Sequence, residues 1–380
     1  NTLIRAIDEY AFDDKLEIVY VTQNAKLAGI GLKRKVYVLP GFAAPSFSEK
    51  LDNKLGRYPV LNNWFKPHRY DSSALYRNYL NQQQIKLLYY PIADLMLMDE
   101  FPFIATYWDI GHCSSYPFPE FTYNGEYNRR ENWYRNYLNR ALLIFSESEA
   151  GKREVVKYLG INENKISVVP MFPAEFTTGN NADSAFSKHN IAKGEYFLYP
   201  AQFWAHKNHY HLVQAFAAFL SGHSNKQFKL VFTGSDKGNA PYIKSLVQQL
   251  GIGNNVVFAG FVEDDFLSAL YKHAAALVMP TFLGPTNMPL LEAARVLCPV
   301  ICTNFEGHRE MLADGALYID PLSSDSIAAA MQQVVTTEVS NRLKQRLQQV
   351  NATSAFTLNN TLTALNKGFV LAQEIRNCWD

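Results

Sequence analysis

Short, unbroken runs of apolar residues recur along the chain and alternate with longer stretches whose apolar residues return every three or four positions. The first pattern is typical of strands buried on both faces of a parallel sheet, and the second of amphipathic helices. In the first half, strands are predicted at 16–21, 35–39, 85–90, 103–107, 142–146 and 166–169. In the second half, they are predicted at 196–200, 228–233, 256–260, 275–279, 300–303 and 317–319. The alternation predicts an α/β protein with two doubly wound domains.

The chain is long enough to form more than one hydrophobic core, because 380 residues are more than a single domain of ordinary size contains. Its hydrophobic content of 48% is ample for burial. Polar and glycine residues interrupt the periodic pattern after residue 170. We therefore expect a first domain over 1–172, a link over 173–193 and a second domain over 194–353. A C-terminal helix within 354–380 is expected to pack back toward the first domain. The chain opens inside what reads as a helix, so the first domain is expected to lack its first strand.

The charge of the chain is nearly balanced, with 36 basic and 35 acidic residues. This balance argues against a nucleic-acid partner. Four scattered cysteines show no paired metal spacing and fit a reduced, intracellular protein without disulfides. No apolar run reaches the roughly 18 residues of a membrane span, and no signal peptide is visible. A cytoplasmic location is expected.

The segment that follows the apolar run 274–279 is predicted to be a loop that leads into a helix. Asn287 is predicted as the N-cap of this helix, and Pro289 is tolerated in its first turn. The backbone amides of Thr286, Asn287 and Met288 would then point out of a helix N-terminus with a positive partial charge. That geometry predicts a phosphate-binding site at the carboxyl edge of the second sheet.

Motifs in both halves carry a family resemblance. The second-half segments are 199–208, 231–235 and 279–292 with its continuation 299–321. The first-half segment is 106–112, followed by Pro117, Pro119 and Glu120. In order and spacing, the second-half segments resemble the family 4 glycosyltransferases of the GT-B fold, and the first-half segment resembles a motif of one bacterial subgroup. The resemblance implies two Rossmann-like domains that face each other across a cleft.

The same resemblance implies an activity. A sugar would move from a nucleotide diphosphate-sugar donor to an acceptor hydroxyl, with retention of configuration and with no metal or other cofactor. The expected acceptor is a glycan or lipid-linked glycan of a bacterial surface polysaccharide. Two alternatives stay open: a GT-B-fold protein that binds a nucleotide without turnover, and a nucleotide-sugar epimerase of related fold.

Three catalytic residues follow from the resemblance: His112, Lys207 and Glu292. Lys207 matches the lysine that contacts the donor diphosphate, where a cation stabilises leaving-group charge; the alternative is a solvated lysine. His112 matches a histidine that approaches the donor sugar from the first domain; the alternative is a core histidine. Asp109 could orient the His112 imidazole or cap the loop. Glu292 is expected to bind the ribose hydroxyls and to be kept ionised by its helix N-terminus.

The donor-binding set implied by the resemblance follows several predicted strands of the second half. It comprises Gln202, Lys207, Gly234, Ser235, Phe261, Thr286, Asn287, Met288 and Glu292. Most relatives carry arginine at the position of Gln202, so more of the diphosphate charge would fall to Lys207 and to backbone amides. Gly284 stands where relatives carry the first of two glutamates, the one that contacts the donor sugar. Thr286 or Asn287 could supply polar contacts instead.

Residues 57–80 are rich in aromatic and basic side chains. They could form an acceptor loop that stacks on sugars, or rest on the inner face of a membrane, or form a packed irregular segment. The basic run 33–35 would add only a weak attraction to anionic lipid. The cluster His206, His209 and His211 is predicted to form a polar helix face rather than a metal site.

Overall fold

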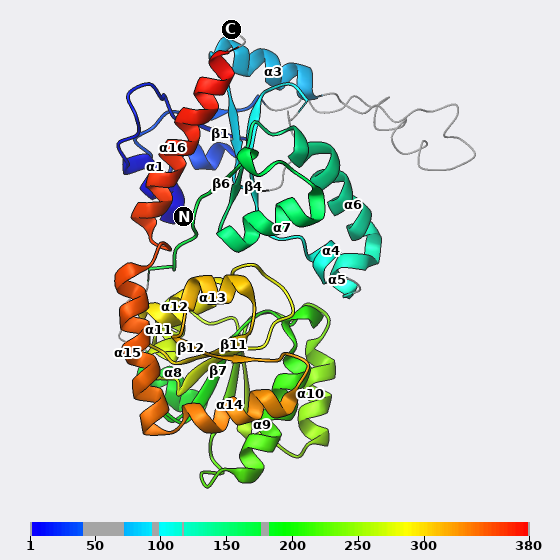
Figure 1. Ribbon diagram of the computed structural model, residues 1–380, viewed down its shortest axis with the longest axis vertical. Coiled ribbons are helices and arrows are strands. Elements are labelled where there is room, and N and C mark those ends of the chain that lie inside the picture. Colours follow the sequence, from blue (N-terminus) through cyan, green and yellow to red (C-terminus); the bar gives the residue numbers. More distant parts are fainter. Residues whose placement is uncertain (1, 41–71, 93–98, 116–117, 176–181, 379–380) are drawn as a thin grey trace, which may run out of the picture.

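Two layered α/β domains lie one above the other in the computed structural model, which describes residues 2–40, 72–92, 99–115, 118–175 and 182–378 (Figure 1). Each domain is built around a parallel sheet flanked by helices. The expected pair of doubly wound domains is therefore confirmed. Within the described ranges, no helix is both long enough and apolar enough to span a bilayer.

The first domain contains two parallel sheets. Its strands are β1 (Tyr20–Thr22), β2 (Val36–Val38), β3 (Leu88–Tyr90), β4 (Phe103–Tyr107), β5 (Leu143–Ser146) and β6 (Ile166–Val168). Strands β1 and β2 pair with each other, while the other four form a sheet in the order β3-β4-β5-β6. The helices are α1 (Thr2–Glu9), α3 (Ser72–Gln82), α4 (Gly111–Ser114), α5 (Pro119–Thr122), α6 (Glu126–Asn132) and α7 (Glu149–Leu159). Tyr107, Leu138 and Ile144 lie in the core between them.

The second domain has one six-stranded sheet. Its strands are β7 (Tyr196–Pro200), β8 (Lys229–Thr233), β9 (Val256–Gly260), β10 (Ala276–Met279), β11 (Val300–Thr303) and β12 (Ala316–Ile319). All six agree with the predicted runs to within one residue at either end. The strand order is β12-β11-β10-β7-β8-β9, so the direction of winding reverses between β7 and β10. Ligands of such sheets bind where the order reverses, outside the carboxyl ends of the strands.

Eight helices of the described chain accompany this sheet. They are α8 (Ala182–Lys188), α9 (His209–Gly222), α10 (Ala240–Gln249), α11 (Asp264–His273), α12 (Met288–Arg295), α13 (Glu306–Leu312), α14 (Ser324–Val334) and α15 (Thr337–Thr353). Helix α8 lies inside the segment 173–193 that was predicted as a link. Its Phe186 and the following Ile191 are buried in the core of the second domain. These residues pack with the second domain because their apolar side chains find a core there.

The last helix, α16 (Leu358–Asn377), returns to the first domain (Figure 1). Leu365 and Phe369 pack in one cluster with Phe145 of β5. The hydroxyl of Thr361 donates to the backbone carbonyl of Pro170, at 2.6 Å. The chain thus crosses between the domains after β6 and again between α15 and α16, and the two crossings are hydrogen-bonded to each other.

Direct contacts also join the domains beside α7. The Glu310 carboxylate of α13 accepts the backbone N–H groups of Glu149 and Ala150, each at 2.8 Å. Amides of a first helical turn have no partner within their own helix, so a carboxylate there is stabilising. At a second point of contact, Gly111 of the first domain allows the two domains to approach closely. A Cβ at this position would lie 2.8 Å from a methyl carbon of Leu283 in the second domain.

We expect Gly368→Ala to lower the free energy of unfolding by about 1–3 kcal/mol, as overpacking of a core does. A Cβ at this helical position would lie 2.5 Å from the Phe145 ring, which outweighs the gain in helix propensity. Gly222→Ala is the matched control, because its Cβ would meet only the flexible end of Gln332, at 3.4 Å. Urea unfolding of both variants makes the measurement. Equal midpoints would show that α16 does not pack on β5 in this way.

Candidate functional site

A cavity of about 1090 Å³ lies between the domains, at the carboxyl ends of β4, β7 and β10. The first-domain wall includes Trp108, Asp109, Glu120, Tyr123, Glu126 and Arg130. The second-domain wall includes Gln202, Trp204, Lys207, Lys237, Gly284, Thr286 and Asn287. The strand order of the second sheet reverses between β7 and β10, so the cavity occupies the place that the topology favours for a ligand.

A chain of hydrogen bonds holds Lys207 on this wall. Its ammonium group donates to Asn287 Oδ1 at 3.3 Å, and Asn287 Nδ2 contacts His308 Nε2 at 3.0 Å. His308 Nδ1 lies 2.8 Å from the backbone carbonyl of Thr303, to which it donates. Burial lowers the pKa of His308 to about 4, so the ring is neutral, with its proton on Nδ1. Nε2 is therefore free to accept from Asn287.

Asn287 is the N-cap residue of α12, as predicted, but its side chain does not cap the helix. The amide bridges Lys207 and His308 instead, because both of these partly or fully buried groups need a partner. The first backbone N–H groups of α12 therefore receive no hydrogen bond from the Asn287 side chain. Lys207, Asn287 and Pro289 all line the cavity, so the start of α12 lies at its edge.

The ammonium group of Lys207 is poorly solvated. Burial lowers its pKa to about 8, while the negative charges of Asp109 and Glu120, from the first domain, act in the opposite direction. An anion placed in the cavity would favour the charged form further. The second-domain wall thus offers a cation and a helix N-terminus to the same ligand.

The loop before α12 has a conformation that excludes a side chain at position 284. Gly284 has φ +122°, and a Cβ there would lie 2.6 Å from Asn287 Nδ2 and 2.7 Å from the Thr286 carbonyl oxygen. A glutamate therefore cannot occupy this position without moving the loop. The Thr286 hydroxyl donates to Glu147 Oε1 of the first domain, at 3.0 Å.

Glu147 follows β5 and is a buried carboxyl group at the domain junction. Its Oε2 has no hydrogen-bond partner in the part of the chain that the structure describes. Burial raises the pKa of Glu147 well above its usual range, which favours the neutral form. This contact could not be predicted from the sequence, because its two partners are 139 positions apart.

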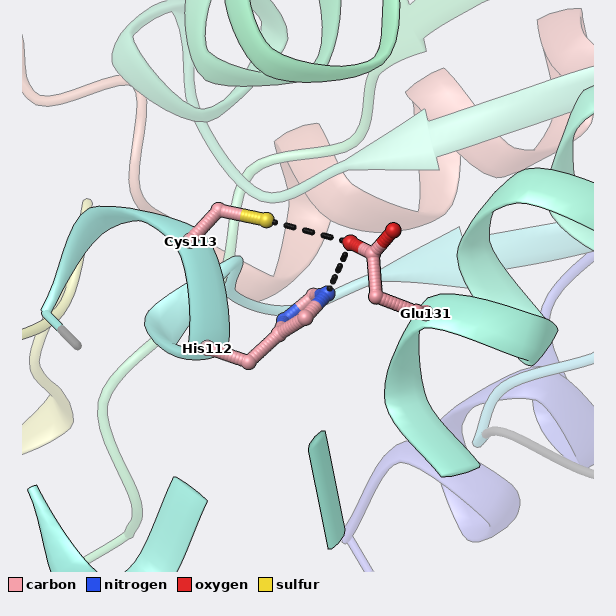
Figure 2. Close-up of side chains that lie close together, drawn as sticks. All are labelled: His112, Cys113 and Glu131. Atoms are coloured by element: carbon pink, nitrogen blue, oxygen red, sulfur yellow. Dashed lines mark hydrogen bonds and ion pairs between the residues drawn. The ribbon is translucent and has the colours of Figure 1, made fainter. Parts of the chain in front are cut away.

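The expected position of His112 needs correction. The side chain is completely buried and does not line the cavity. Its Nε2 lies 3.0 Å from Glu131 Oε1, as Figure 2 shows, and Arg130 Nε donates to its Nδ1 at 3.3 Å. Burial lowers the pKa of His112, and the Arg130 charge acts in the same direction. The alternative of a core histidine describes this geometry, and Arg130 is the neighbour that reaches the cavity.

His112, Cys113 and Glu131 bring three metal-binding atom types within 4.8 Å of one another (Figure 2). A metal-bound histidine normally donates its other ring N–H to a carboxylate or carbonyl, whereas Nδ1 here accepts from a guanidinium group. Burial raises the pKa of the Cys113 thiol to about 11, and Arg135 is paired with Glu131. The cluster fits a hydrogen-bonded network better than a cation site.

Asp109 caps the loop rather than orienting His112. Its Oδ1 accepts the backbone N–H of Gly111 at 2.8 Å and pairs with the Arg130 guanidinium. The Tyr134 hydroxyl donates to the Asp109 carbonyl. The pair Asp109 and Arg130 is thus fixed on the first-domain wall of the cavity.

The prediction of a polar helix face at His206, His209 and His211 is wrong for two of the three. Both His206 and His209 are buried. His206 packs against Phe121 of the first domain, and His209 packs against Phe203 within the second domain, with ring centres 5.4 and 4.3 Å apart. Glu120 of α5 accepts both the backbone N–H, at 2.8 Å, and the Nδ1–H of His206. Burial raises the pKa of Glu120, but these bonds lower it by more, so the net pKa lies below its usual range. Glu120 was visible in the first-half motif, but its partner was not.

Not every predicted donor-binding residue reaches the cavity. Gln202 does, and its Oε1 accepts from the Trp204 indole at 3.0 Å. Those outside its lining are Gly234, Ser235, Phe261, Met288 and Glu292. Glu292 Oε2 accepts from the Tyr271 hydroxyl at 2.6 Å. Burial raises the pKa of Glu292, contrary to the expectation that the helix N-terminus keeps it ionised.

The aromatic segment 57–80 is only partly described by the structure, and 57–71 fall outside the described residues. Tyr76 is buried, and Arg77 is paired with Glu100, which fits the packed alternative at this end. In the basic run, the backbone N–H groups of Lys33 and Arg34 bind the Asp8 carboxylate, at 2.6 and 2.9 Å. Several cavity residues had no sequence signal, among them Tyr123, Glu126, Arg130 and Lys237.

Two Rossmann-like domains with a phosphate-compatible wall at the switch point define the GT-B class of glycosyltransferase structures. Residues 181–352 match the family described as "Glycosyl transferases group 1". The match covers most of the second domain, and it confirms the resemblance seen in the second-half motifs.

Curated relatives cover part of the chain. The O-antigen chain mannosyltransferase B of Escherichia coli is 25% identical over 239 residues, which are 60% of this chain and 60% of the relative. The O-antigen chain mannosyltransferase RfbU of Salmonella typhimurium is 25% identical over 197 residues, 52% of each chain. The chain thus spans between half and two thirds of the length of these two relatives.

Solved structures match over nearly the whole chain. A glycosyltransferase from Rickettsia africae has a TM-score of 0.65 at 14% identity, covering 94% of this chain and 89% of its own. Anabaena Alr3699/HepE in complex with UDP-glucose has a TM-score of 0.64 at 15% identity, covering 93% and 99%. WaaG, a glycosyltransferase involved in lipopolysaccharide biosynthesis, has a TM-score of 0.65 at 14% identity, covering 96% and 93%. At these identities the matches show the GT-B fold alone.

We expect Asn287→Ala to lower the free energy of unfolding by about 1–3 kcal/mol, because it leaves the buried Nε2 of His308 without a partner. Urea unfolding measures the change. Asn136→Ala is the control, since this exposed amide binds only Asn132, at 2.8 Å. If both variants unfold at the midpoint of the parent, the bridge between Lys207 and His308 does not stabilise the fold.

Proposed function

We propose that the protein is a retaining glycosyltransferase that moves a sugar from a nucleotide diphosphate-sugar to a hydroxyl of a glycan or lipid-linked glycan in bacterial surface glycan synthesis. The observation that carries this proposal is the convergence of Lys207 and the α12 N-terminus on one interdomain cavity. A lipid-linked acceptor would bring the protein to the inner face of the membrane. The named relatives from E. coli and Salmonella are mannosyltransferases, so mannose is the first donor sugar to test.

The diphosphate of the donor would lie against the second-domain wall. The backbone N–H groups of Thr286 and Asn287, which line the cavity just before α12, would bind its oxygens, and the Lys207 ammonium would stabilise the charge that the leaving nucleotide acquires. Gln202 brings no cation to this wall. Lys237 supplies one instead, with its ammonium 5.5 Å from the centre of the Trp204 ring, whose indole is bonded to Gln202.

The ribose of the nucleotide would lie farther along α12. Glu292 is three residues beyond Pro289, which lines the cavity, so it is about one helical turn away. Its carboxyl group would exchange the Tyr271 hydroxyl for the vicinal hydroxyls of the ribose, which favour the ionised form. The reacting sugar carbon would then face the Arg130 and Asp109 pair of the first domain rather than His112.

Product analysis tests the function. The protein is incubated with GDP- and UDP-sugars and an oligosaccharide acceptor, and products are separated by mass spectrometry. A transferase produces an acceptor that is heavier by one sugar. An epimerase changes only the donor sugar, and a nucleotide-binding protein without turnover changes nothing. The same assay with EDTA is expected to give the same rate, because Lys207 and helix amides take the place of a metal; loss of activity that magnesium restores would contradict this.

The affinity for UDP or GDP is expected to fall as the pH rises through about 8, the pKa of Lys207. Below that pH the ammonium is charged and binds the diphosphate. Above it the charged fraction falls up to about ten-fold per pH unit, and affinity falls with it. Calorimetric titrations of UDP and GDP at pH values from about 6.5 to about 9.5, on either side of the Lys207 pKa, measure this change in affinity.

Lys207→Gln is expected to bind weakly and with no such pH dependence. Lys272→Gln, which removes an exposed lysine outside the cavity, serves as the control and should follow the parent. A Lys207→Gln variant whose affinity still falls through the same pH range would assign the titration to another group.

A further inference from the structure

Two large aromatic side chains are exposed on the first-domain wall of the cavity. Trp108 follows β4 and is 42% exposed, and Tyr123 follows α5 and is 67% exposed. Both line the cavity. Exposed apolar groups inside a cavity indicate a binding surface more often than groups scattered over a convex face do.

The Trp108 ring is held in place. Its indole Nε1 donates to the backbone carbonyl of Pro91 at 2.8 Å. The next residue, Asp109, is fixed by its bonds to the Gly111 amide and to Arg130. An aromatic ring that is already ordered loses little conformational entropy when a ligand binds to it.

Polar groups accompany the two rings. Asn124 and Glu126 line the same wall. The Glu126 carboxylate is bound by both Arg129 nitrogens, at 2.8 and 2.7 Å, and these bonds lower its pKa, so it is ionised at neutral pH. It therefore offers acceptor oxygens to hydroxyl groups.

A sugar ring matches this combination. A pyranose has an apolar face of C–H groups, which packs on an aromatic ring, and an edge of hydroxyl groups, which donate to carboxylate and amide oxygens. A nucleotide diphosphate matches it less well, because it has no apolar sugar face for both rings and its charge is drawn to Lys207 on the opposite wall.

We propose that Trp108 and Tyr123 form a stacking subsite for a pyranose ring of the acceptor glycan, and that Asn124 and Glu126 bind the hydroxyls of that ring. This acceptor subsite rests on the proposed function, which requires an acceptor hydroxyl in the cavity. It adds that the acceptor is recognised by a sugar ring, and not only by a lipid or a phosphate.

The test compares Trp108→Ala and Tyr123→Ala with the parent and with Tyr242→Ala. Tyr242 is the matched control, because it is 56% exposed but lies outside the cavity lining, stacked on Tyr210 at 6.1 Å. Thermal unfolding first establishes that all four proteins are folded. Trisaccharides of mannose, glucose, galactose and N-acetylglucosamine are then titrated in saturating UDP or GDP and followed by NMR.

We expect the parent and Tyr242→Ala to bind at least one trisaccharide, and each cavity variant to bind it about ten-fold more weakly, the loss of a good stacking contact. Trp108→Phe, which keeps a ring, should recover part of the affinity. Binding that is unchanged in both cavity variants would overturn the subsite. So would a parent that binds none of the four trisaccharides.

A second titration separates this subsite from the proposed function. The affinity of each variant for UDP and GDP is expected to equal that of the parent, and only the KM for the acceptor should rise during transfer. An equal loss of nucleotide affinity would place the rings at the donor and overturn the acceptor assignment. A parent that binds trisaccharide through Trp108 but makes no product would refute the transferase while supporting the subsite.

Discussion

A cation with little access to water is the constraint around which the cavity is arranged. Lys207 keeps its charge near neutral pH because Asn287 accepts from it and because two carboxylates of the first domain lie within electrostatic reach. The Asn287 side chain presents its oxygen to Lys207 because its amide nitrogen donates to Nε2 of His308. Nε2 accepts this bond because burial keeps His308 neutral. The groups that keep Lys207 charged therefore come from both domains, and the second domain alone does not supply them all.

The loop before α12 carries Gly284 at the position where the resemblance predicts a glutamate. A glycine at 284 permits a backbone that brings the Asn287 amide close enough to bridge Lys207 and His308. The same backbone leaves no room for a glutamate side chain. Among the residues described, Glu147 of the first domain binds this loop by accepting from the Thr286 hydroxyl.

The sequence predicts a structural feature correctly where the signal for that feature is local. Each strand of the second sheet is an apolar run that ends at turn residues, so its bounds were predictable, and so was the place of Asn287 at a helix start. The direction of a side chain depends on residues far along the chain. His112 follows its strand as predicted, yet it turns toward Glu131 on α6 and not toward the cavity. Likewise, the pairing of Glu120 with His206 joins residues 86 positions apart.

The two places where the chain crosses between domains lie together, joined by the bond from Thr361 to Pro170. In Figure 1, α15 and α16 run along one side of the molecule, while α4 and α5 approach the second domain on the other. A rotation of the domains about these crossings would break the contacts of α5 with the second domain, such as the bonds from His206 to Glu120. A substitution that stiffens the crossings would limit how wide the cavity can open without altering any residue that lines it.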